Sequence, residues 1–207
     1  MPAIPPNSLI AITGISGYIA SYIGLWALRG GYRVRGTVRS SARADSLKAG
    51  YEKQGIPASE LAARLEFVIV ANLDSEEQWT AALNDVDGIV HAALNIENLE
   101  KNDIVEEAVR GTLSLLNAAK KCPSVKRVVL TSSVVTVITA PMKRDKVLTT
   151  DDWNDEMLDI FEKDLPKDHD PIPKQALFFL PYSAAKLKAE REAWESVKEV
   201  CGHQCFS

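Results

Sequence analysis

Short apolar runs alternate with longer stretches in which apolar residues recur at helical spacing. The apolar, β-branched runs that predict buried strands lie at 9–13, 33–38, 65–71, 86–92 and 126–132. Helical patterns lie at 17–30, 41–54, 75–84, 100–121, 151–163 and 182–199. Strands alternating with helices in this way are typical of an α/β fold, in which a parallel sheet is covered on both faces.

Single residues mark the faces and ends of some predicted helices. The helix at 17–30 has Ile19, Ile23, Trp26 and Ala27 on one face, and glycines follow its end. Pro181 suits the first position of the last helix, because proline lacks the backbone N–H that is unpaired there. Prolines and charges interrupt the pattern at 138–180, so we expect a long loop there around the short helix.

Composition excludes several classes of protein. The chain has 207 residues, of which 46% are hydrophobic and 25% charged, as in an ordinary globular domain. A net charge of −4 argues against binding nucleic acid or a membrane surface, since both favour a basic face. Three cysteines are too few for a disulfide scaffold, and we find neither a signal peptide nor an apolar run that could span a bilayer. These features predict a soluble, cytoplasmic protein.

The first strand runs into "TGISGYIA", where Gly14, Gly17 and Ala20 are spaced by three residues. Gly14 permits a sharp turn, Gly17 lets a ligand approach the backbone, and Ala20 lets a helix pack closely on the strand. The helix then directs its N-terminal amides and positive dipole end at the loop. The spacing indicates a pyrophosphate site for a dinucleotide, although small residues so spaced also occur in plain tight turns.

The second strand and its end, "YRVRGTVRSSAR", contain arginines and no acid. In a dinucleotide fold this strand end lies beside the adenine ribose, where an acid selects NAD and an arginine accepts the 2′-phosphate of NADP. Arg39 lies at the expected strand end, and Arg43 follows one helical turn later. The pattern favours NADP(H) over the alternative of an ordinary solvated basic edge. Arg33 and Arg35 receive no assignment.

Two further motifs carry candidate chemistry. Ser132 and Ser133 follow the fifth strand, at the edge of the sheet where ligands bind in open parallel sheets. Tyr182 and Lys186 are four residues apart and share one face of the last predicted helix. An ammonium beside a phenol favours the phenolate, so such a pair can exchange a proton with a carbonyl or alcohol oxygen. Each motif alone also fits a purely structural role.

Taken together, the order of these motifs resembles the extended short-chain dehydrogenase/reductase family, in its branch of dihydroflavonol-reductase-like enzymes and fungal NADPH-dependent aldehyde and ketone reductases. The resemblance covers about residues 8–197 and rests on "TGISGYIA", "VRGTVRSSAR", "VDGIVHAA", "VRGTLSLLNAA", "VKRVVLTSS", "DDWN" and "YSAAK". It implies a Rossmann-type doubly wound parallel sheet and the reduction of a small-molecule carbonyl by NADPH. The sequence "SSVVTV" favours reductases over nucleotide-sugar epimerases.

The resemblance also implies roles for particular residues. Ser133 would position the substrate oxygen, Tyr182 would donate the proton, and Lys186 would ease ionisation of the phenol and bind the nicotinamide ribose. The 138–180 loop would lie near the active site. The implied cofactor contacts are Gly14, Gly17, Tyr18, Ile19, Arg39, Arg43 and Lys186, with Asn72 and Leu73 replacing the acid-plus-apolar pair usual beside the adenine.

The C-terminal end departs from the family pattern. Relatives of this kind continue into a lobe that forms much of the substrate pocket, whereas this chain stops at Ser207, so we expect residues 1–200 to form one NADP-binding domain without that lobe, followed by an atypical tail at 201–207. Cys201, His203 and Cys205 are a poor zinc signature, and we expect no metal. Two alternatives stay open: a nucleotide-sugar epimerase or dehydratase, and an NADP-binding protein without catalytic activity. The oligomeric state is open as well.

Overall fold

The computed structural model describes residues 4–95, 103–138, 147–163 and 179–201. The chain divides into two compact units. The first unit comprises residues 1–94 and 114–131 and contains the whole sheet. The second comprises residues 95–113 and 132–207, and its described elements are helical.

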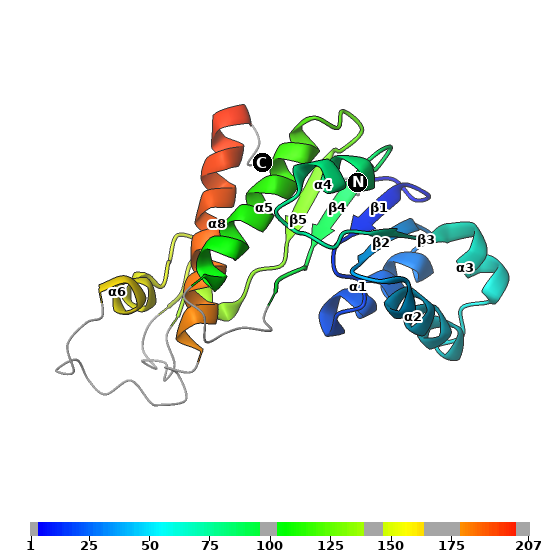
Figure 1. Cartoon of the computed structure of the whole chain (residues 1–207), viewed down its shortest axis with the longest axis horizontal. Helices are drawn as coiled ribbons and strands as arrows, with labels where there is room; N and C mark the ends of the chain where they lie inside the picture. The colour runs from blue at the N-terminus through cyan, green and yellow to red at the C-terminus, as the bar shows by residue number, and fades with distance from the viewer. Residues whose placement is uncertain (1–3, 96–102, 139–146, 164–178, 202–207) are drawn as a thin grey trace. The chain divides into compact units, whose positions relative to one another are not determined.

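A five-stranded parallel sheet forms the centre of the first unit (Figure 1). Its strands are β1 (Leu9–Ile12), β2 (Arg33–Val38), β3 (Leu65–Ile69), β4 (Gly88–His91) and β5 (Arg127–Leu130). They are ordered β3-β2-β1-β4-β5 and pair in parallel throughout. The order reverses direction between β1 and β4, which is where open α/β sheets bind their ligands. The predicted Rossmann-type α/β fold is confirmed.

Helices cover both faces of this sheet. They are α1 (Tyr18–Arg29), α2 (Ser41–Lys53), α3 (Ala58–Arg64), α4 (Glu76–Ala82) and the C-terminal part of α5 (Ile104–Lys120). Figure 1 shows α1 and α2 on one face, with α4 and α5 on the other. Right-handed crossovers place helices in this way when the strand order runs outward from β1 in both directions.

Helix α1 packs on the sheet through its small residues. Its buried positions include Ala20, Gly24 and Leu28, whereas Ile19 and Trp26 on the apolar face named from sequence are 58% and 63% exposed. A Cβ at Gly24 would lie 2.4 Å from the Tyr51 hydroxyl, which donates a 2.6 Å hydrogen bond to the Ser21 carbonyl. The buried face thus combines small residues, which allow close approach of the backbone, with Leu25 and Leu28, which fill the core.

The second unit is built around a long helix. It contains a 3₁₀ turn, η1 (Val134–Thr136), and the helices α6 (Asp155–Lys163) and α8 (Leu180–Cys201), together with the first turns of α5. Asn154 joins the segment before α6 to η1, because its backbone N–H donates to the Thr136 carbonyl and its side-chain amide to the Val135 carbonyl, both at 2.8 Å. Trp153 lies under the Arg191 guanidinium of α8, 4.9 Å from ring centroid to Cζ.

Asp87 joins β1 to the start of β5 and should make stability depend on pH. Its carboxylate accepts the Leu9 N–H at 2.9 Å and lies 3.3 Å from the Lys126 ammonium. The backbone hydrogen bond from Leu9, aided by the Lys126 charge, holds the pKa of Asp87 below its ordinary value. A depressed carboxyl pKa stabilises the fold above the unfolded-state pKa, and this stabilisation is lost as pH falls through the folded-state pKa.

We therefore expect Asp87→Asn to lower the unfolding free energy at neutral pH and to make little difference once Asp87 is protonated. Urea titrations of both proteins at neutral and acid pH measure the two values. Asp45→Asn, at an exposed position on α2, is the matched control. An equal loss of stability at both pH values would show that the charge of Asp87 contributes nothing.

Candidate functional site

The loop after β1 is held in a tight turn beside the ends of β2 and β4. Gly14 has a φ of 61°, and a Cβ added to it would come within 3.2 Å of Ala93. The Gly14 N–H donates to the Thr37 hydroxyl at 3.0 Å, and the Ile15 N–H donates to the Thr37 carbonyl at 3.1 Å. Only glycine satisfies both the positive φ and the close approach without strain.

Thr13 connects this loop to the end of β4. Its side-chain oxygen accepts the N–H groups of Ala92 and Ala93 at 3.0 and 2.9 Å. Because this oxygen accepts two hydrogen bonds, the Thr13 hydroxyl can donate its own proton to Nδ1 of His91, 2.8 Å away. Thr13 and His91 are 0% and 4% exposed, and the His91 ring meets Trp79 edge-on with centroids 6.3 Å apart. This network holds the strand ends together where the sheet order reverses.

A pocket opens at this reversal point. Its lining residues are Gly14, Ser16, Gly17, Thr37, Val38, Arg39, Arg43, Val70, Leu73 and Ala92–Leu94. Arg39 and Arg43 therefore line the same pocket as the glycine loop. Gly17 also caps α1 and has no side chain to occupy the helix's free amides, so the N-terminus of α1 borders the pocket with its donors available to an anion.

The other arginines of β2 have structural contacts. Arg35 forms a 2.7 Å ion pair with Glu66 and donates to the carbonyls of Ala82 and Asn84. The side chain of Arg33 donates to the Asn7 carbonyl at 3.1 Å. Arg33 and Arg35 lie within β2, whereas Arg39 follows the strand end and Arg43 lies in the first turn of α2, and only these last two line the pocket.

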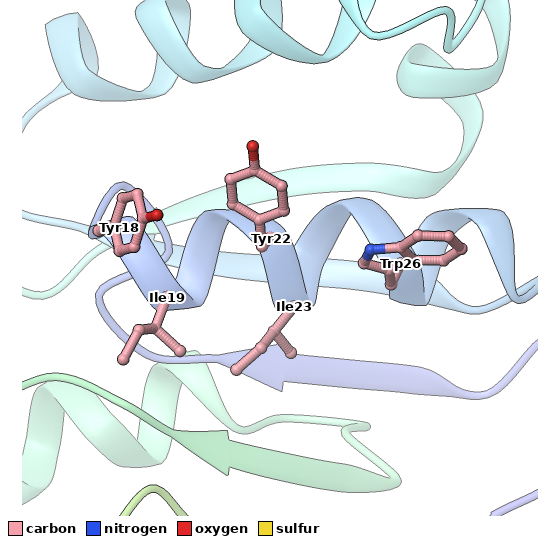
Figure 2. Close-up of a pocket in the computed structure, with 5 residues that line it drawn as sticks. All are labelled: Tyr18, Ile19, Tyr22, Ile23 and Trp26. Carbon is pink, nitrogen blue, oxygen red and sulfur yellow. The ribbon is translucent and has the colours of Figure 1, made fainter.

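Three residues expected to contact the cofactor have side chains elsewhere. The Asn72 side chain is exposed and accepts the Asp74 N–H at 3.0 Å, so of the "NL" pair only Leu73 lines the pocket. Tyr18 and Ile19 instead line an apolar groove on the surface of α1. Figure 2 shows this groove, which Tyr22, Ile23 and Trp26 complete, with Ile19 and Ile23 pointing to one side of the helix and Tyr22 to the other.

The second unit places the predicted tyrosine and lysine on one face of α8. Tyr182 and Lys186 are half-buried, one helical turn apart. Glu190 lies one further turn along the same face. Burial lowers the pKa of the Lys186 ammonium, and the nearby Glu190 carboxylate acts in the opposite direction. Such a lysine is more easily deprotonated than an exposed one.

The serine pair forms a turn that is bonded to α8. Ser133 is the N-cap residue of η1, and its carbonyl accepts the Thr136 N–H at 3.0 Å and the Thr136 hydroxyl at 2.8 Å. Ser132 donates a short hydrogen bond to the Glu190 carboxylate, and its oxygen lies 3.2 Å from the Thr136 hydroxyl oxygen. The sequence patterns named the two serines but missed Glu190, whose only signal was its four-residue spacing from Lys186.

The described residues bear on two features that the sequence predicts to be absent, a metal site and a membrane-spanning helix. Among the side chains that the structure describes, in residues 4–95, 103–138, 147–162 and 179–198, no three acidic, histidine or cysteine side chains are grouped as metal ligands would be. The side chain of Cys201, and the residues His203 and Cys205, lie outside this described part. Among the described helices, none is long and apolar enough to cross a membrane.

A parallel sheet with a glycine loop at its reversal point defines the Rossmann class of folds. The family model for the NAD-dependent epimerase/dehydratase family matches residues 10–154 of this sequence. The chain belongs to this family, within the extended short-chain dehydrogenases/reductases.

The chain is similar to named fungal proteins. It is 36% identical over 198 residues to the NAD-dependent epimerase/dehydratase terH of Aspergillus terreus, covering 95% of this chain and 55% of that protein. It is 33% identical over 198 residues to aldehyde reductase 2 of Sporidiobolus salmonicolor, covering 95% and 54%. Among solved structures, yeast methylglyoxal/isovaleraldehyde reductase Gre2 complexed with NADPH matches at 25% identity and a TM-score of 0.67, covering 92% of this chain and 53% of that one. The chain spans about half the length of the curated relatives it matches.

Proposed function

We propose that this chain carries the cofactor-binding and proton-donating residues of an NADPH-dependent carbonyl reductase, which acts on a small aldehyde or ketone. The observation that carries the proposal is the pocket in which Arg39 and Arg43 meet the glycine loop. The similarity to aldehyde reductase 2 and to the NADPH complex of Gre2 supports the same cofactor and reaction.

The residues of the pocket fit a dinucleotide phosphate. Gly14 and Gly17 line the pocket, and a pyrophosphate bound beside them would be stabilised by the N-terminus of α1. The planar guanidinium groups of Arg39 and Arg43 can bind a ribose 2′-phosphate through paired hydrogen bonds. Leu73 would contribute an apolar contact to the adenine.

The side chains of the second unit fit the proton transfer. NADPH, when bound, supplies the hydride that a carbonyl carbon accepts. The Tyr182 phenol would donate a proton to the carbonyl oxygen, and the Ser133 hydroxyl would hold that oxygen by a hydrogen bond. The Lys186 ammonium would stabilise the phenolate that remains and bind the nicotinamide ribose.

A decisive first experiment is thermal unfolding of the full 207-residue chain with NADPH or with NADH, followed by assays of NADPH oxidation with aldehydes and ketones. At a cofactor concentration of about 100 Kd, binding stabilises the fold by about 2.7 kcal/mol, which raises Tm by several degrees. A shift with NADPH alone, followed by carbonyl-dependent oxidation, supports the proposal. A shift with neither cofactor, or with NADH alone, contradicts it.

Arg39→Ala should remove the preference for NADPH. Losing charge-assisted hydrogen bonds worth about 1.5–3 kcal/mol weakens NADPH binding by about 10- to 150-fold, whereas NADH, which lacks the 2′-phosphate, should bind as before. Fluorescence titration of both cofactors measures the two affinities. Arg33→Ala, which removes the same charge at the far end of β2, is the matched control and should leave both affinities unchanged. Equal losses for both cofactors would refute the assignment of Arg39.

A second candidate is a nucleotide-sugar epimerase or dehydratase, since terH is named as an NAD-dependent epimerase/dehydratase. Such an enzyme would convert a UDP- or dTDP-sugar without net consumption of the nicotinamide cofactor. Chromatography of these sugars after incubation with the chain and cofactor distinguishes it from a reductase. Cofactor binding without any conversion would instead identify the chain as an NADP-binding protein.

A further inference from the structure

The Glu190 carboxylate lies at the junction of two groups that the proposed reaction needs. It accepts the Ser132 hydroxyl proton, and it is one helical turn from Lys186 on the face of α8 that also carries Tyr182. Ser132 directly precedes Ser133 in the turn that leads into η1. One carboxylate is therefore bonded to the serine turn and placed beside the lysine.

We propose that Glu190 is a positioning residue, which keeps the Lys186 side chain charged and fastens the Ser132–Ser133 turn to α8. This inference rests on the proposed reductase function, but it concerns a residue that acts through Lys186 and Ser133 and does not touch the substrate. The same carboxylate has both roles. The hydroxyl groups of Tyr182 and Ser133 and the ammonium of Lys186 would therefore all be positioned by helix α8.

The serine turn is held from two sides. From α8, the carboxylate of Glu190 binds the Ser132 hydroxyl. From the segment before α6, Asn154 binds the carbonyls of Val135 and Thr136 at 2.8 Å each. Thr136 is 2% exposed and bonds back to the Ser133 carbonyl through both its N–H and its hydroxyl. Ser133 is thus fixed between an anchor at Ser132 and an anchor at Thr136.

Among the described residues, Glu190 places a negative charge near Lys186 on the same helix. α8 packs against η1, which has no ionisable side chain, and against α6. The acids of α6 that bond to α8 are engaged elsewhere, because Asp155 pairs with Arg191 and Glu162 pairs with Lys188 at 2.8 Å. α6 also carries Glu156 and Asp159. The Glu190 carboxylate acts to raise the Lys186 pKa, against the effect of burial.

Competitive acetylation of the full chain with acetic anhydride, read by peptide mass spectrometry over a range of pH, reports the protonation of Lys186 without requiring turnover. Glu190→Gln retains an oxygen acceptor for Ser132 and removes the charge, so we expect the Lys186 labelling midpoint to move to lower pH. Glu190→Asp, which restores a carboxylate, should recover part of that shift. Glu192→Gln, at an exposed position of the same helix, is the matched control and should leave the midpoint unchanged.

Ser132→Ala tests the second role separately. It leaves the charge of Glu190 in place and removes the hydrogen bond, so hydrogen exchange at the Thr136 and Val137 amides should become faster while the Lys186 midpoint moves little. If the chain reduces carbonyls, the alkaline limb of kcat/KM in Glu190→Gln should also shift to lower pH, because Lys186 then loses its proton earlier.

Two results would overturn the proposal: an unchanged Lys186 midpoint in folded Glu190→Gln, or unchanged exchange in Ser132→Ala. Circular dichroism establishes whether each variant folds. If Glu190→Gln does not fold, Glu190→Asp tests the role of the charge. Its carboxylate lies one methylene farther from Lys186, so the Lys186 labelling midpoint should still shift measurably. Failure of the proposed function is separately visible, since the wild-type chain would then oxidise no NADPH although labelling and exchange still report on Glu190.

Discussion

Replacing Trp79 with alanine should lower the free energy of unfolding by about 3–5 kcal/mol. The Trp79 side chain is 0% exposed and lies edge-on to the His91 ring. Its indole N–H donates to the Leu73 carbonyl at 2.7 Å. Truncation therefore removes a large apolar side chain, opens a cavity beneath α4, and leaves a carbonyl without its donor.

Urea unfolding followed by circular dichroism measures the loss. Trp26→Ala is the matched control, because Trp26 is 63% exposed and its removal should change stability by no more than about 0.5 kcal/mol. Comparable losses in the two variants would show that Trp79 is not part of the core. Because Leu73 lines the pocket, NADPH should also bind more weakly to Trp79→Ala than to Trp26→Ala.

Tyr182→Phe should reduce carbonyl turnover by about 10²- to 10⁴-fold, the range associated with losing a general acid. Phenylalanine keeps the ring and removes only the hydroxyl, so helix α8 should be undisturbed. NADPH affinity should stay close to that of the wild type, because the pocket residues of the glycine loop and Arg39 are unchanged. Stopped assays of NADPH oxidation at saturating cofactor measure the rate.

Tyr22→Phe provides the comparison for this variant, since Tyr22 is 55% exposed on α1 and is assigned no role. It should retain full activity. If Tyr182→Phe oxidises NADPH at a rate within a few-fold of the wild type, Tyr182 is not the proton donor. A parallel loss of NADPH affinity would indicate a binding role for the phenol in place of proton donation.

Most of the fold could be predicted from the sequence because strand and helix patterns are local. The strand predicted at 33–38 has those bounds, and the others are shortened by one to three residues in total at their ends. The helix α3 (Ala58–Arg64) was not predicted. It has seven residues, too few to show a helical period, and it runs directly into β3, so its apolar positions merge with those of the strand.

The grouping of four candidate residues could be predicted because each belongs to a local motif with recognisable spacing. Gly14 and Gly17 come from the loop after β1, Arg39 follows β2, Arg43 lies in the first turn of α2, and all four line one pocket. Contacts that depend on distant segments gave no local signal. Thr13 meets His91 across 78 positions of sequence, and Ser132 meets Glu190 across 58.

The hydrogen bonds of Thr13 restrict how this position can change during evolution. Its side-chain oxygen accepts two partly buried N–H groups at once, and its hydroxyl proton faces a buried histidine ring. Valine has nearly the same shape but would leave those donors unpaired, and each unpaired donor costs up to about 1–3 kcal/mol, the upper end applying to full burial. Among the other natural amino acids, serine alone keeps a hydroxyl at that distance from the backbone, so substitutions at this position should be confined to threonine and serine.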